Sequence, residues 1–209
     1  GKKVLVTAGP TKEFIDPFRC LTNPSSGKMG ISIANECAKR GAEVILVSSV
    51  DNETISNNVK KIKITSTNDM FEAVKNNFKD CDFIIKAAAV SDYTPVQVFD
   101  KKVKKQDGNL TIEFQRTQDI LKYVGDNKHE GQKIIGFAAE TNNLIEYAKE
   151  KIVKKNLDYI VANDISKKDI GFGSDDNEVY IIDKHDNIKK IDKSNKNNIS
   201  KAIVDEISK

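Results

Sequence analysis

Short apolar runs, rich in β-branched residues, alternate along this chain with segments in which apolar residues recur every three or four positions. The apolar runs have the length of buried strands and lie at 4–8, 43–49, 82–90, 133–139 and 157–165. The periodic segments have the spacing of amphipathic helices and lie at 28–40, 68–78, 118–125 and 142–155. Strands that alternate with helices in this way predict βαβ units and a mostly parallel sheet.

We therefore expect an α/β fold: a Rossmann-like, doubly wound sheet with helices on both faces, in a single domain over residues 1–209. Two regions depart from the alternation. Residues 94–116 are polar and lysine-rich with one alternating strand at 110–114, and they predict a long arm for dimerisation, a lid over the site, or both. Residues 178–209 predict a late hairpin and a closing helix.

The composition indicates a soluble protein of nearly balanced charge. Hydrophobic residues make up 38% and charged residues 31%, and the net charge is +3 without a concentrated basic patch, so we expect no nucleic-acid partner. No apolar run approaches the ~20 residues of a membrane span. The three cysteines lack CxxC spacing and no export signal is evident, so free thiols in the cytoplasm are expected. The two histidines are isolated, and the start "GKKVLVTAG" indicates a processed or excised domain.

The loop after the first strand is the first candidate for chemistry, because ligands of such sheets bind beyond the carboxyl ends of the strands. It reads "AGPTKEFIDPFRCLTNPSSGKMG" and matches neither the dinucleotide GxGxxG pattern nor a Walker A loop. Ser25, Ser26 and Gly27 precede a helix whose first amides favour an anion, although an ordinary serine cap explains them equally. Arg19 could clamp an anionic group and Asn23 could donate to an oxyanion; a surface ion pair and a turn are the alternatives.

Later strand ends also carry polar or bare positions. In "KAAAVSDY" (86–93) three alanines expose backbone to a flat ligand and Asp92 stands at the rim, although small residues packing under a helix explain the alanines too. The lysine run 100–106 could reach a polyphosphate or form a solvated face. Phe137 could stack on a base, and Lys151 and Lys155 share one helix face. The segment "VANDIS" (161–166) is a further polar strand end, or a turn.

Taken together, these segments resemble the phosphopantothenate–cysteine ligases of coenzyme A biosynthesis. The quoted loop, "KAAAVSDYTP", "KKVKKQ", "GFAAETNN", "KEKIVKKNLDYIVANDIS" and "GFGSDDN" follow the family's order between residues 7 and 177. The resemblance implies a ligase, unrelated to the ATP-grasp enzymes, that joins 4′-phosphopantothenate to L-cysteine through an acyl-cytidylate made from CTP, releasing pyrophosphate and CMP. It also implies Mg²⁺, a homodimer, and a fused or partner flavin-dependent phosphopantothenoylcysteine decarboxylase.

The resemblance further implies roles for individual residues. Asn23 and Lys102 match catalytic positions, the first at the acyl centre and the second on the triphosphate. Arg19 matches a substrate-side arginine, next to the loop of Ser25, Ser26 and Gly27. The nucleotide-binding positions are Lys86, Ala87, Ala88, Asp92, Lys102, Gln118, Asp119, Ile120, Leu121, Phe137, Lys151 and Lys155. Gln118 departs from the family, in which many members carry proline. The resemblance assigns no metal ligands.

Two other functions compete with the ligase. A nicotinamide-dependent reductase would use the same sheet, but the GxGxxG fingerprint is missing, and the spacing of Tyr147 and Lys151 is expected not to fit a Tyr-x-x-x-Lys catalytic pair. A non-catalytic nucleotide-binding module would bind CTP without releasing pyrophosphate.

Overall fold

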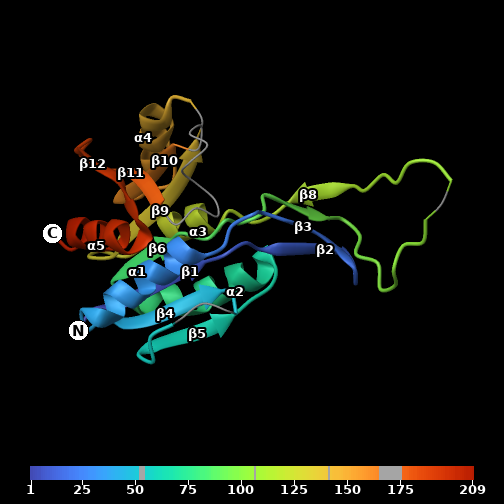
Figure 1. The fold of residues 1–209 in the computed structure, drawn as a ribbon, viewed down its shortest axis with the longest axis horizontal. Helices are drawn as coiled ribbons and strands as arrows, with labels where there is room; N and C mark the ends of the chain where they lie inside the picture. Colours follow the sequence, from blue (N-terminus) through green and yellow to red (C-terminus); the bar gives the residue numbers. More distant parts are fainter. Residues whose placement is uncertain (52–54, 106, 141, 165–175) are drawn as a thin grey trace.

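A computed structural model describes residues 1–51, 55–105, 107–140, 142–164 and 176–209, and it shows an eight-stranded sheet (Figure 1). The strand order is β12-β11-β10-β9-β6-β1-β4-β5. Six strands run parallel: β1 (Lys3–Ala8), β4 (Glu43–Ser48), β5 (Val59–Lys63), β6 (Phe83–Lys86), β9 (Lys133–Glu140) and β10 (Tyr159–Asp164). β11 (Asp176–Asp183) and β12 (Ile188–Asn195) extend the sheet as an antiparallel hairpin. The parallel order reverses between β1 and β6, which is where such sheets bind ligands.

Helices cover both faces of this sheet, so the predicted doubly wound fold is confirmed. One face carries α1 (Lys28–Lys39) and α5 (Lys196–Ile207), and the other carries α2 (Thr67–Asn77), α3 (Ile120–Asp126) and α4 (Leu144–Lys154), with a 3₁₀ turn η1 (Phe78–Asp80) after α2. The late hairpin and closing helix are also present, as β11–β12 and α5. Among the residues that the model describes, no helix is long and apolar enough to cross a bilayer.

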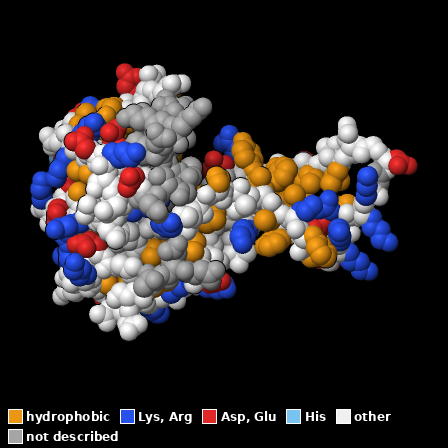
Figure 2. Space-filling view, viewed as in Figure 1, with side chains coloured by type: hydrophobic (Ala, Val, Ile, Leu, Met, Phe, Trp, Pro, Cys, Tyr) orange, Lys and Arg blue, Asp and Glu red, His pale blue; other side chains and the backbone are white. Residues whose placement is uncertain are grey.

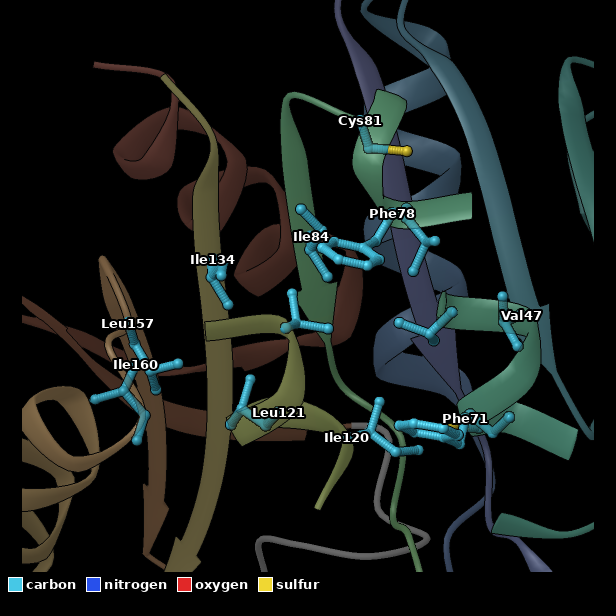
Figure 3. Packing of buried hydrophobic residues seen from close by; sticks show 14 of the residues in the cluster. Val47, Phe71, Phe78, Cys81, Ile84, Ile120, Leu121, Ile134, Leu157 and Ile160 are labelled. Atoms are coloured by element: carbon cyan, nitrogen blue, oxygen red, sulfur yellow. The ribbon is translucent and has the colours of Figure 1, made fainter. Parts of the chain in front are cut away.

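Alternating side chains of the central strands supply two separate cores. Leu5 and Ile84 face the α2 side, whereas Val6 and Ile85 face the α1 side. On the α2 side, Ile84 packs with Phe78 of η1 and with residues of α3 and β9 (Figure 3). Fully burying an apolar side chain of this size contributes about 1.5–3 kcal/mol. Because side chains alternate along a strand, Lys86 continues the row of Ile84 toward the carboxyl edge of the sheet.

The start of α1 differs from the serine cap that the sequence favours. The N-cap position is Gly27, in a left-handed conformation with φ of 77°, and no side chain caps the helix. A Cβ at Gly27 would lie 2.8 Å from Val50, and one at Gly30 would lie 2.6 Å from Ala8, so only glycine allows this approach. The amino end of α1 is therefore pressed against the end of β1. By contrast, α2 begins with a serine cap, a capping box between Ser66 and Asp69.

A long arm leaves the carboxyl edge of the sheet (Figure 1). It combines the hairpin of β2 (Lys12–Asp16) and β3 (Arg19–Thr22) with the hairpin of β7 (Tyr93–Pro95) and β8 (Phe114–Arg116) and the loop between β7 and β8. The sequence analysis missed β2, β3 and β7. It placed a strand at 110–114, which is wrong except for its last residue, because β8 begins at Phe114.

The carboxylate of Asp16 ties the two hairpins of the arm together. Its side chain is only 1% exposed, and it accepts hydrogen bonds from Arg19 Nε at 3.0 Å, Phe18 N at 2.8 Å and Val103 N at 3.1 Å. The Arg19 guanidinium, followed by these backbone amides, holds the pKa of Asp16 well below its usual range. The arm is therefore an ordered element with its own ionic centre.

Two further differences concern the sheet. β5 was missed because "VKKIK" is only partly buried and charged, as suits an edge strand. The strand predicted at 82–90 is shorter, since β6 ends at Lys86. Ala87, Ala88 and Ala89 therefore form an extended segment beyond the strand, in which the amide of Ala89 donates to Gly9 O at 3.0 Å.

Candidate functional site

Two clefts open at the carboxyl edge of the sheet, one on each face. The α1 cleft has a volume of about 230 Å³ and lies at the start of α1. The α3 cleft has a volume of about 420 Å³ and lies at the start of α3. Ala88 and Phe137, from beyond β6 and from β9, line both clefts. The two clefts therefore meet at the tips of neighbouring central strands.

Small and apolar residues, hydroxyl and amide side chains, and two lysines, Lys28 and Lys196, line the α1 cleft. Ser25 Oγ accepts from the amide of Gly27 at 3.3 Å, which shapes the turn before the helix. The lining residues are Ser25–Gly30, Ala87–Ala89, Phe137–Ala139, Asn163, Asn177, Val179 and Lys196. This set contains the whole predicted serine and glycine loop together with polar residues of β10 and β11. The cleft is suited to a ligand with both an anionic end and amide or hydroxyl groups.

Asn163 carries an unsatisfied hydrogen-bond acceptor in the α1 cleft. Its side-chain oxygen is buried and has no partner among the residues that the model describes. A buried acceptor without a partner costs about 1–3 kcal/mol, so such groups are rare unless a ligand or water satisfies them. From the sequence, 161–166 is predicted only to be a polar strand end or a turn. The structure shows that Asn163 of this segment lines the α1 cleft.

Charged side chains from four segments line the α3 cleft. They are Lys86, Asp92, Arg116, Asp119 and Lys155. Asp119 Oδ1 caps α3 by accepting from the amide of Lys122 at 3.0 Å, and its Oδ2 pairs with Lys155 Nζ at 3.0 Å. Burial acts to raise the pKa of Asp119, but the Lys122 amide and the Lys155 ammonium outweigh it and hold the pKa below its usual value. Asp119 is thus an ionised carboxylate that an anionic ligand would have to displace from Lys155.

Most of the predicted nucleotide positions lie together in the α3 cleft. Lys86, Ala88, Asp92, Gln118, Asp119, Ile120, Leu121, Phe137 and Lys155 line it, whereas Ala87 lines the α1 cleft. Burial lowers the pKa of Lys86 to about 8, against the opposing effect of Asp119. The structure therefore brings most of these predicted positions together, on one face of the sheet.

Asn23 lies beside the junction of the clefts. It is half-buried, and its side-chain amide donates to Ala89 O at 3.1 Å. Ala89 lines the α1 cleft directly after the shared Ala88. The second N–H of the amide can serve a group bound at this junction. The position is compatible with the role that the sequence analysis gave to Asn23.

Besides Asn23, three predicted site residues line neither cleft. Arg19 Nη2 pairs with Asp16 at 2.5 Å and also donates to Val103 O at 2.8 Å, within the arm. Lys102 lies over the ring of Phe18, also in the arm, with Nζ 5.0 Å from the ring centroid. Lys151 pairs with Glu140 at 2.7 Å. Within one chain, the structure does not bring these cations to the other site residues.

One expectation about a competing function was wrong. Tyr147 and Lys151 do have the Tyr-x-x-x-Lys spacing of a reductase pair. Neither residue lines either cleft, and the ammonium of Lys151 is held by Glu140. The spacing therefore reflects the helical repeat of α4 and does not build a catalytic pair at the carboxyl edge.

The sequence analysis missed several lining residues because they come from elements outside the parallel strands. Tyr93 and Arg116 belong to β7 and β8 of the arm, and Asn177 and Lys196 belong to β11 and the start of α5. The strand-end rule applies to parallel strands and does not select such residues. The only pattern in the sequence that points to these residues is a polar side chain at the end of an apolar run.

Neither thiol chemistry nor a metal cage built by side chains is supported. Burial raises the pKa of Cys37 to about 12 and that of Cys81 to about 11, which makes both thiols poor nucleophiles. Among the described residues, no group of three or more His, Cys, Asp or Glu side chains is placed to hold a metal ion.

Comparisons with known proteins place the chain in one family. The family model described as the DNA/pantothenate metabolism flavoprotein C-terminal domain matches residues 1–209. The coenzyme A biosynthesis bifunctional protein CoaBC of Bacillus subtilis is 46% identical over 209 residues, which are 100% of this chain and 51% of that protein. The chain therefore spans about half the length of this relative.

Solved structures give the same answer. A crystal structure of the C-terminal domain of CoaBC superposes with a TM-score of 0.84 at 40% identity, covering 99% of this chain and 94% of that one. A mutant of Cab2 in complex with phosphopantothenate-cysteine shares the fold, with a TM-score of 0.77 at 16% identity over 99% of this chain and 85% of that one. The chain belongs to the family of DNA/pantothenate metabolism flavoprotein C-terminal domains.

Proposed function

We propose that this chain is the phosphopantothenate–cysteine ligase of coenzyme A biosynthesis and activates 4′-phosphopantothenate with CTP. The observation that carries the proposal is the meeting of two clefts at Ala88 and Phe137. A reaction between two large anions requires separate binding sites that share one reacting point. Membership of the family and the similarity to CoaBC support the same assignment.

The α3 cleft is the proposed CTP site. Ala88, beyond β6, and Phe137, of β9, both line this cleft, and the amide of Ala88 donates to Thr7 Oγ1 at 3.2 Å, so its carbonyl is the backbone group offered to the nucleotide. Lys86 and Lys155 supply positive charge for the triphosphate. Since Lys155 is paired with Asp119, the triphosphate must take over this lysine from the carboxylate. Mg²⁺ would enter on the triphosphate oxygens, where it reduces the charge of the nucleotide.

The α1 cleft is the proposed 4′-phosphopantothenate site. The amino end of α1, with the turn at Gly27, suits the phosphate group. The unpartnered oxygen of Asn163 suits an amide N–H or a hydroxyl of the pantothenate chain. This orientation would direct the carboxylate of the substrate toward Ala88 and the neighbouring cleft.

The proposed reaction has two steps. The substrate carboxylate attacks the α-phosphorus of CTP, and pyrophosphate leaves, which forms the acyl-cytidylate. The amine of L-cysteine then attacks the acyl carbon; the amide forms, the amine loses its proton, and CMP leaves. Asn23, beside the junction, would donate to the oxyanion that develops on the acyl oxygen.

We also propose that the active form is a homodimer. Lys102 and Arg19 lie in the arm and line neither cleft of their own chain. Apolar side chains cover much of the arm in the space-filling view (Figure 2), and the exposed ones include Phe14, Phe18, Leu21, Tyr93, Val96, Val98, Leu110 and Phe114. Phe18 is 72% exposed, which is unusual for phenylalanine outside an interface. A second chain that covers this surface would receive Lys102 in its α3 cleft.

The assay for the ligase measures pyrophosphate release with 4′-phosphopantothenate and each of the four nucleoside triphosphates, with and without L-cysteine. We expect CTP to support release and L-cysteine to permit turnover to CMP and amide. Binding of CTP without pyrophosphate release would favour the non-catalytic module instead. NADPH binding in place of CTP binding would favour the reductase.

A mixing experiment tests the shared site. Lys102→Gln and Lys155→Gln are each expected to impair pyrophosphate release. If Lys102 acts in the partner's cleft, mixed dimers contain one site with both lysines, so mixing the two variants should restore part of the activity. If mixing restores nothing although sedimentation shows that mixed dimers form, Lys102 does not act across the interface.

The relative CoaBC is named as a bifunctional protein, and the product of the proposed reaction has a cysteine carboxylate that can be removed. We therefore propose that a flavin-dependent phosphopantothenoylcysteine decarboxylase, fused or separate, uses this product. Co-purification of such an activity with the native protein would test the link.

A further inference from the structure

Lys86 occupies a position that the sheet would ordinarily give to an apolar residue. It is the last residue of β6 and follows Ile84 in the row that faces the α2 side of the sheet. Its neighbours in the sheet are Thr7 of β1 and Gly136 of β9. These neighbours bring no charge. The lysine therefore enters the α3 cleft from the end of an apolar core.

The ammonium group of Lys86 makes neither a hydrogen bond nor an ion pair with any residue that the model describes. Lys155 in the same cleft, by contrast, is paired with Asp119. The charged and titratable groups that share the cleft come from the β6–β7 loop, the arm, the start of α3 and the end of α4. They are Asp92, Tyr93, Arg116, Asp119 and Lys155. A lysine without a partner at the base of a cleft is suited to an incoming anion.

We propose that Lys86 contacts a phosphate group of the nucleotide and takes up a proton from solvent when the nucleotide binds. The inference rests on the proposed function, because it assumes that the α3 cleft is the CTP site. It adds a positioning role for Lys86 and makes nucleotide binding dependent on pH. It names the phosphate groups, and not the base, as the part of CTP that Lys86 recognises.

The physical reason is the competition between burial and charge. In the free protein, burial lowers the pKa of Lys86 to about 8. The carboxylates of Asp119 and Asp92 act to raise this pKa, and the nearby ammonium of Lys155 acts to lower it further. A phosphate oxygen beside the ammonium favours the charged form and raises the pKa again. At pH 8, about half of the free molecules carry a neutral Lys86, so binding should take up to about half a proton per CTP. CTP affinity should fall as pH rises above 8.

Calorimetry measures this proton directly. CTP is titrated into the full chain at pH 8, without 4′-phosphopantothenate, in HEPES and in Tris, and the difference in binding enthalpy gives the number of protons taken up. We expect uptake by the wild type and none by Lys86→Arg, which stays charged. Lys86→Met should bind CTP at least tenfold more weakly, also without uptake. Its long apolar side chain continues the row of Ile84, so this variant is expected to fold.

Two controls separate the source of any proton uptake. Lys122→Met changes an exposed lysine of α3 that lines neither cleft, so uptake should remain as in the wild type. Cytidine carries the base without phosphates and should bind without uptake. Equal uptake with cytidine, or uptake that persists in Lys86→Met, would overturn the inference.

The inference and the proposed function fail in different ways. If CTP binds and pyrophosphate is released, but no proton is taken up, Lys86 does not have this role and the ligase assignment stands. If CTP does not bind the wild type at any pH, both are wrong.

Discussion

The α1 cleft and the α3 cleft are formed by the same strand tips but differ in chemistry. The α1 cleft presents serine hydroxyls, asparagine side chains, a glycine turn and two lysines, whereas five charged side chains of both signs line the α3 cleft. The difference arises because successive residues of a strand point to opposite faces of the sheet. Of the residues that the model describes, only Ala88 and Phe137 line both clefts. One pair of strand ends can therefore present two unlike ligands to each other.

The two clefts also differ in the interactions that maintain their shape. The α1 cleft depends on close backbone packing, since a side chain at Gly27 or Gly30 would collide with Val50 or Ala8. The α3 cleft depends on an ion pair, Lys155 with Asp119, that an anion has to rearrange. We therefore expect the α1 cleft to be formed before its ligand binds, and the α3 cleft to reorganise its charges during binding.

The largest effect is expected where the clefts meet. In Asn23→Asp, the side-chain amide that donates at the junction is replaced by a carboxylate, which repels an oxyanion. Loss of one oxyanion donor reduces rates roughly 10²–10³-fold in other enzymes, so attack by cysteine should slow by about this factor. Rapid-quench analysis should show the acyl-cytidylate accumulating. Equal slowing of pyrophosphate release and of amide formation would remove Asn23 from the second step.

The next largest effect distinguishes the α3 cleft from the α1 cleft. Lys155→Gln removes a cation of the α3 cleft, and a hydrogen bond to a charged group contributes about 1.5–3 kcal/mol, or roughly 10–100-fold. We expect the KM for CTP to rise by this factor while the KM for 4′-phosphopantothenate stays within about twofold.

Lys154→Gln is the matched control for Lys155→Gln, because Lys154 is the exposed neighbour at the end of α4 and lines neither cleft. It should change neither KM. A rise in the KM for 4′-phosphopantothenate alone in Lys155→Gln would exchange the proposed occupants of the two clefts.

Strand ends were predictable from the sequence, but their faces were not. The carboxyl ends of parallel strands lie along one edge, so finding the strands was enough to bring Ser25, Asp92 and Phe137 to the same region. The face on which each side chain lies depends on where the strand ends. β6 ends at Lys86, four residues earlier than expected, and no local pattern gives this point.

Long-range packing explains the other failures. Ser25 and Ser26 fit the local rule for a helix cap, yet Gly27 takes that position because Val50, distant in sequence, leaves no room for a side chain. The arm contains short strands without a sustained apolar period, so β2, β3 and β7 were missed. Arg19 and Lys102 follow the arm, and their distance from the clefts could not be read from their spacing.

A smaller effect is expected for Asn163, whose side-chain oxygen is the unpartnered acceptor of the α1 cleft. Asn163→Ala removes the buried oxygen, and a neutral hydrogen bond contributes about 0.5–1.5 kcal/mol, or roughly 2–10-fold. The KM for 4′-phosphopantothenate should rise by this factor with the KM for CTP unchanged. Thermal unfolding should show no loss of stability, because the wild type leaves this acceptor unsatisfied. Asn57→Ala, at an exposed turn, serves as the control.

The smallest effect concerns the stability of the folded chain, and it tests the charged lining of the α3 cleft without any ligand. The folded pKa of Lys86 is lowered to about 8 from 10.5, so between these values the unfolded chain binds more protons than the folded one. The free energy of unfolding should therefore rise with pH across this window, by about 1 kcal/mol after allowance for solvent contact. In Lys86→Met the rise should be absent and the stability at pH 7 higher. Urea unfolding of both proteins at pH 7, 8 and 9 measures the difference. If the free energy of unfolding changed with pH in the same way in both, burial in the apolar row beneath the α3 cleft would not disfavour the charged form of Lys86.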